Sequence, residues 1–222
     1  MLLDFVAGSP LLSNGAPPAI GPLRLSSPCE RAYSGAMDQP RFLSGQFLLA
    51  MPGIGDARFD KAVIAMCVHD EEGALGIGLG RIVPRIGFHD LLKQLDVDPG
   101  AAPDVAIHLG GPVEPQRGFI LHSCDWGASE SIDVGGRWKL SATLDILRAI
   151  AEGKGPTRWI AALGYAGWGA GQLEQEMGRH GWFVTPGSED LLYDCDVNTR
   201  WAAAFRSAGV DPRLLTADFG TA

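Results

Sequence analysis

Short apolar runs separated by turn residues fill the first patterned part of the chain. The run from Phe42 to Met51 ends at Pro52-Gly53, and the runs Ala62–His69 and Ala74–Gly80 are joined by Asp-Glu-Glu-Gly. Apolar runs bounded by Gly and Pro predict strands, and a four-residue connection with Gly last predicts a hairpin. Apolar residues at helical spacing then predict a short helix. They are Phe88, Leu91, Leu92 and Leu95.

Strand-like and helix-like segments alternate in the second half. Strands are predicted at Val105–Leu109, Phe119–His122, Arg158–Leu163 and Trp182–Thr185, with a hairpin of 131–134 and 137–140 around Gly135-Gly136. Three helices are predicted. The first is capped by Ser141 and has an apolar face of Leu144, Leu147, Ile150 and Ala151, and the second lies at about 171–180. The third is capped by Asp196 or Asn198 and carries Trp201, Ala204, Phe205 and Ala208. Hairpins mixed with strand–helix units predict mixed α and β structure with a mixed sheet, and not a clean doubly wound one.

Residues 1–36 differ from the rest of the chain in composition. They are rich in Pro, Gly, Ser and Ala and show no hydrophobic period. This composition predicts a disordered leader, with Met37 as the expected true start. A chain of 222 residues favours one domain, which we place at residues 37–222.

The net charge of the chain and the distribution of its basic residues exclude some classes of binding partner. The net charge is −8, and the two acidic and two basic residues of the leader cancel, so the excess belongs to the remainder. Basic residues are scattered and form no cluster that could neutralise phosphates, so generic nucleic-acid binding is not expected. No stretch of 18 apolar residues and no signal-peptide pattern occurs, so we expect a cytoplasmic protein without a membrane partner.

The glycine-rich segment 164–171 is the main candidate for ligand contact. A strand followed by a glycine turn and a helix is the context in which backbone N–H groups bind phosphate, but the spacing fits neither the dinucleotide nor the phosphate-loop fingerprint. Two readings stay open. Tyr165, Gly167, Trp168 and Gly169 line a ligand pocket, or the glycines let the backbone pass beneath a buried Trp168, with at least one of Gly164, Gly167 and Gly169 at positive φ.

His122 and Ser123 are the other candidate ligand-binding residues. They stand beside Cys124 and Asp125, but neighbours on a strand point to opposite faces and no nucleophile elbow surrounds Ser123. The alternating glycines of 76–80 lack a third fingerprint glycine and are typical of close packing within a strand. The five His residues have no metal-site spacing, so the sequence predicts no catalytic residues, no metal and no cofactor.

Three segments, taken in order, resemble the AlgH/YqgE family of bacterial proteins. They are Leu43–Gly53 (LSGQFLLAMPG), Leu109–Val113 (LGGPV) with Gly118–Ser123 (GFILHS), and Gly164–Glu176 (GYAGWGAGQLEQE). The similarity runs from about residue 41 to the end. One departure follows the 62–80 hairpin, where the family usually reads Asn-Arg-Pro and this chain reads Gly80-Arg81-Ile82-Val83-Pro84.

The resemblance implies a bacterial, cytosolic protein of the α+β class whose mixed, largely antiparallel sheet curls into a partial barrel with flanking helices. The family carries the label of a proposed transcriptional regulator, without established catalytic residues. Together with the residues, this favours a non-enzymatic regulatory or interaction protein with an unidentified protein or small-molecule partner. The alternative is a small-molecule-binding protein or enzyme with a pocket near Gly164–Gly171.

Overall fold

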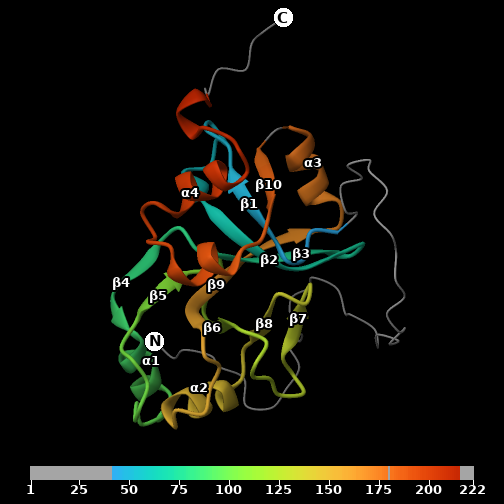
Figure 1. The fold of residues 1–222 in the computed structure, drawn as a ribbon. Coiled ribbons are helices and arrows are strands. Elements are labelled where there is room, and N and C mark those ends of the chain that lie inside the picture. The colour runs from blue at the N-terminus through green and yellow to red at the C-terminus, as the bar shows by residue number, and fades with distance from the viewer. Residues whose placement is uncertain (1–41, 180, 216–222) are drawn as a thin grey trace, which may run out of the picture.

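The computed structural model describes residues 42–179 and 181–215, so the predicted leader lies outside the described residues. Figure 1 shows a strongly curled sheet with helices at both ends. The strands are β1 (Gln46–Ala50), β2 (Val63–Asp70), β3 (Gly73–Gly78), β4 (Ile82–Gly87), β5 (Ala106–Leu109), β6 (Val113–His122), β7 (Ile132–Val134), β8 (Trp138–Ser141), β9 (Trp159–Gly169) and β10 (Trp182–Pro186). The α-helices are α1 (Phe88–Gln94), α2 (Leu144–Ala151), α3 (Gln172–Gly178) and α4 (Arg200–Ser207), with short 3₁₀ helices at Ala57–Phe59 and Pro212–Leu214 and a π-helix at Asp190–Asp194.

The sheet is largely antiparallel and forms a half-barrel. Its strand order is β10-β1-β2-β3-β9-β6-β8-β7, with β5 alongside β9 and β4 paired to β5. Strand β5 runs parallel to β9, while the other pairs are antiparallel. The predicted α+β class and the mixed, curled sheet are therefore confirmed.

The long strand β9 connects the two halves of the sheet. Residues 159–165 pair with β6, and the following residues 166–169 pair with β3. Gly164 lies at the register shift in the β6–β9 pairing, between Leu163 and Tyr165. Its φ of +72° is a backbone angle that only glycine adopts at little cost. The prediction of a strand ending at Leu163 followed by a glycine turn was therefore wrong, because the glycine segment continues the strand through Gly169.

Three apolar clusters fill the fold because most strands bury both faces. In β1, Phe47 and Leu49 belong to the cluster that also holds α4, whereas Leu48 belongs to the cluster beneath α3. The apolar faces of α1 and α2 cover β5, β6 and β9 and form the third cluster. Strands buried on both faces read as continuous apolar runs, which is why 42–51 showed no alternation.

Smaller differences concern element ends. Strand β4 was not predicted: Pro84 interrupts its pattern, and Arg85 has φ +64°. Helix α2 begins after Thr143, because Ser141 belongs to β8. Helix α4 begins after Thr199, and the Asp196 carboxylate instead accepts from the N–H of Asn198 in the preceding turn.

Candidate functional site

Four glycines meet at a backbone crossing near the middle of the sheet, which we call the glycine crossing (Gly78, Gly110, Gly111 and Gly164). A Cβ on Gly110 would lie 2.1 Å from the Gly164 oxygen, and one on Gly111 would lie 2.1 Å from the Tyr165 carbonyl carbon. A Cβ on Gly78 would lie 2.8 Å from the Leu109 oxygen. Only residues without a side chain allow these backbones to approach so closely.

Hydrogen bonds fix the connection between β5 and β6 at this crossing. The Gly78 N–H donates to the Gly110 oxygen at 2.7 Å, and the Gly110 N–H donates to the Leu163 oxygen at 2.8 Å. The Leu109 N–H donates to the Arg81 oxygen at 2.9 Å. The segment is thus bonded to the chain on both sides and forms a rigid wall.

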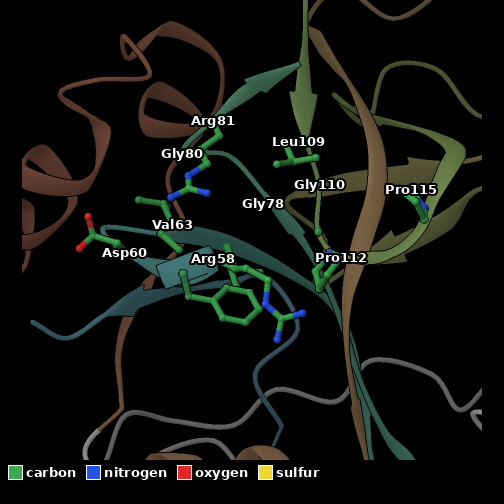
Figure 2. Close-up of a pocket in the computed structure, with 14 residues that line it drawn as sticks. Arg58, Asp60, Val63, Gly78, Gly80, Arg81, Leu109, Gly110, Pro112 and Pro115 are labelled. Carbon is green, nitrogen blue, oxygen red and sulfur yellow. The ribbon is translucent and has the colours of Figure 1, made fainter. Parts of the chain in front are cut away.

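A cavity of about 220 Å³ lies against this wall (Figure 2). Its lining comes from three segments: residues of 58–64, residues of 78–81, and residues of 109–115. Most of the lining is apolar, with Phe59, Val63 and Leu109 among the side chains. Leu109 is 39% exposed at the mouth. An apolar concavity with a few polar groups is the usual form of a small-molecule site.

Arg58 and Arg81 bring positive charge to the cavity, and Asp60 also lines it. The Arg58 guanidinium is bonded to the Asp56 carboxylate through Nε and Nη2, and this contact raises the pKa of Arg58. Arg81 donates from Nη2 to the Ala57 oxygen at 3.0 Å and forms no ion pair within the described part of the chain. In Figure 2 the Asp60 carboxylate lies on the opposite side of the view from Leu109 and Pro112.

A third cation, Arg200, lies next to the cavity lining. Arg200 is buried, and its guanidinium donates to the backbone oxygens of Leu79, Leu191, Leu192 and Cys195. Leu79 stands between two cavity-lining glycines. His108, also buried, has its pKa lowered to about 4, first by burial and then by the charge of Arg200. Its Nδ1 has no hydrogen-bond partner among the described residues.

Tyr165 and Trp168 lie on opposite faces of β9. Tyr165 packs in the cluster with α4, and its hydroxyl donates to Glu114 at 3.4 Å. Trp168 packs beneath α3, and its Nε1 donates to Glu176 at 2.9 Å. Trp168 is 4% exposed and Gly164 has positive φ, so both structural expectations for this segment are confirmed. The two rings do not face one common pocket, and the ligand role of Gly167 and Gly169 stays a prediction.

His122 and Ser123 lie near the other end of β9, where His122 is paired with Trp159. His122 bonds to the Ser123 oxygen through Nδ1 and to the Ser141 hydroxyl through Nε2, each at 2.9 Å. A carbonyl oxygen only accepts, so Nδ1 carries the proton; burial lowers the pKa of the ring. The Ser123 hydroxyl donates to Asp125. His122 and the Ser123 hydroxyl are therefore not arranged as base and nucleophile, and their ligand role also stays a prediction.

Sequence reasoning missed the residues that line the cavity, Arg58, Arg81 and Leu109 above all. The usable signal was the glycines: alternation at 76–80 predicted close packing, and the structure places Gly78 against the Gly110-Gly111 pair. The sequence did not indicate that these segments meet.

Within the described ranges, no group of three or more His, Cys, Asp or Glu side chains is placed to hold a metal ion. No described helix combines the length and apolar character needed to cross a bilayer.

Comparison with known proteins shows which family this chain is similar to. A family model described as AlgH-like matches residues 47–213. The chain belongs to the AlgH-like family. A UPF0301 protein of Rhizorhabdus wittichii is 64% identical over 186 residues, which cover 84% of this chain and 100% of that protein. A UPF0301 protein of Novosphingobium aromaticivorans is 55% identical over the same shares of both chains.

Solved structures agree with the AlgH-like assignment. The solution structure of the AlgH protein from Pseudomonas aeruginosa is 35% identical, with a TM-score of 0.69, covering 85% of this chain and 100% of that one. A crystal structure of a Corynebacterium diphtheriae protein is 21% identical, with a TM-score of 0.63, covering 86% of this chain and 95% of that one. The second likeness shows the shared fold alone.

Proposed function

We propose that this AlgH-like protein is a non-enzymatic, cytoplasmic binding protein that holds a small molecule in the cavity beside the glycine crossing. The observation that carries the proposal is the cavity itself, walled by backbone that hydrogen bonds hold in place on both sides. A pre-formed site loses little freedom when a ligand enters, and this favours binding.

The volume sets the size of the ligand. A cavity of 150 Å³ accommodates benzene, so about 220 Å³ would hold a molecule of roughly nine or ten non-hydrogen atoms. Phe59, Leu109 and Pro112 offer apolar contact to its body. The cavity also supports the small-molecule alternative raised by the sequence, since its wall packs directly on Gly164 and Tyr165.

Binding without catalysis is favoured by the polar groups present. A hydroxyl or thiol nucleophile needs a base within hydrogen-bond reach, and the lining contains no Ser, Thr, Cys, Lys or His; its only acidic side chain is that of Asp60. A regulatory or interaction role is consistent with such binding if the bound molecule changes the affinity of the protein for a partner. The guanidinium groups of the two arginines offer several N–H donors and are suited to holding a ligand in place.

A fragment screen by thermal shift tests the proposal, because a ligand that binds only the native state raises the melting temperature. We expect fragments of about this size to raise the Tm, and we expect Leu109→Trp, at the exposed mouth, to abolish the rise. Leu214→Trp is the matched control, since Leu214 is 79% exposed and does not line the cavity. Equal shifts in wild type and Leu109→Trp would place binding elsewhere and contradict the proposal.

A further inference from the structure

We propose that the cavity selects small carboxylates: a compact apolar body inside, with the anionic group held at the Arg81 side. This inference rests on the proposed binding function and adds the chemical class of the ligand. It is carried by two separate observations, a buried cation without a carboxylate partner behind the cavity wall and an arginine with unused donors in the lining.

Arg200 is the buried cation. Its guanidinium is bonded to backbone oxygens alone, and no Asp or Glu forms an ion pair with it in the part of the chain that the structure describes. Buried charges are usually paired, because removing a charge from water is costly. One of its contacts is the Leu79 oxygen, and the next residue, Gly80, lines the cavity. Arg200 is therefore bonded to the backbone immediately next to the cavity lining.

His108 is a second buried group close to Arg200. It lies on β5 beside the residues that form the wall, and its protonated form is disfavoured first by burial and then by the charge of Arg200. The acidic groups near Arg200 are Asp196 and the Cys195 thiol, whose influence on it is secondary to burial. A neutral ring next to an unpaired cation leaves the positive charge uncompensated, and an anion in the cavity would compensate it.

Arg81 supplies the direct contact. A guanidinium has five N–H donors in a planar fork that matches a carboxylate. One Nη2 donor of Arg81 is engaged by the Ala57 oxygen, and no carboxylate among the described residues is bound to it. Arg58 differs, because Asp56 already occupies its Nε and Nη2 donors. Arg81 is thus the arginine of this cavity that is available to a ligand.

Size and lining restrict the body of the ligand. The estimate of roughly nine or ten non-hydrogen atoms matches a ring or a short branched chain carrying one carboxylate. Extended polyanions fit poorly, because the surrounding protein carries a net charge of −8 and the lining beyond the two arginines and Asp60 is apolar or glycine. Leu109, Pro112 and Pro115 are among the lining residues, which favours an apolar neighbour for the ring.

Benzoate and benzamide form the probe pair for the test, since both have nine non-hydrogen atoms and only the first is charged at pH 7. Binding of each to the full-length protein is measured by chemical-shift titration at constant ionic strength. We expect benzoate to bind about tenfold more tightly than benzamide, a difference of about 1.4 kcal/mol. Arg81→Gln should remove most of that preference and leave benzamide binding unchanged, and Arg81→Lys should retain part of it.

Arg213→Gln serves as the control, because Arg213 is exposed, is paired with Asp211 and does not line the cavity. Equal binding of benzoate and benzamide, or an Arg81→Gln effect of the same size on both, would overturn the carboxylate inference and leave the cavity as a ligand site. Failure of benzoate to bind, while neutral fragments still give Leu109-dependent thermal shifts, would overturn it in the same way. If no fragment raises the Tm of the wild-type protein, or if the rise is the same in Leu109→Trp, the proposed function itself is refuted.

Discussion

Replacing Trp168 by alanine should destabilise the protein strongly, because this side chain links β9 to α3. Trp168 is 4% exposed and packs edge-on against Trp182 at 6.0 Å between ring centroids. Truncation of a buried Trp to Ala costs about 3–5 kcal/mol. The lost Nε1 hydrogen bond to Glu176 adds about 1 kcal/mol, at the lower end for a charged acceptor because Glu176 is only half-buried and water can replace the donor.

Urea unfolding followed by far-ultraviolet circular dichroism measures the loss. We expect about 4–6 kcal/mol for Trp168→Ala at an unchanged m-value. Trp168→Phe is the matched variant: it keeps most of the apolar area and loses the N–H donor, so about 1–2 kcal/mol is expected. A loss below about 1 kcal/mol for the alanine variant is the size of a surface change. It would refute the structural reading and return Trp168 to the ligand-binding candidates.

Three further predictions concern the crossing, the buried histidine and nucleic acid. Gly164→Ala should cost roughly 2–4 kcal/mol, because its Cβ would lie 2.5 Å from the Gly111 oxygen and because φ is +72°. Gly171→Ala is the control: its φ is +69° but the space around it is open, so it should cost about 1 kcal/mol. Similar losses for the two variants on urea unfolding would contradict the close crossing. His108 has a pKa of about 4 in the native state against 6.5 when unfolded, so the unfolded chain binds the proton first and stability falls as pH drops through this window. We expect roughly 2 kcal/mol lost to His108 between pH 7 and 4.5, a contribution absent in His108→Gln, and an identical pH dependence in both proteins would refute it. Fluorescence anisotropy should detect no salt-sensitive binding to generic duplex DNA near 10⁻⁴–10⁻⁶ M, the usual non-specific range.

Local pattern predicted most elements of the fold because their signals are local. The 62–80 hairpin, the Gly135-Gly136 hairpin and the apolar faces of α1 and α2 follow from turn chemistry and periodicity within about ten residues. Strand β4 was not predicted because Pro84 breaks its pattern, and because its partner strand β5 is distant in the sequence, with Ile82 opposite His108 and Gly87 opposite Ala106. The curl of the sheet came from the family resemblance and did not follow from the pattern.

The candidate site was less accessible to sequence reasoning for a physical reason. Its wall depends on contacts between segments separated by more than thirty residues, such as Gly78 with Gly110 and Gly111 with Tyr165. A glycine's function as a point of close approach depends on what lies opposite it, which one sequence does not specify. The three segments that carried the family resemblance include both Gly110 and Gly164, although the sequence does not show that these two residues are in contact.

The most direct test of the ligand-binding cavity is to map where a ligand binds. A ¹H–¹⁵N titration of the full-length protein with the best fragment from the thermal-shift screen would identify the perturbed amides. We predict saturable shifts concentrated at Gly78, Gly80 and Leu109–Gly111, with the same residues silent in Leu109→Trp. Saturable shifts centred on Trp168 and Gly169, or on His122 and Ser123, with no change at the cavity, would contradict the account.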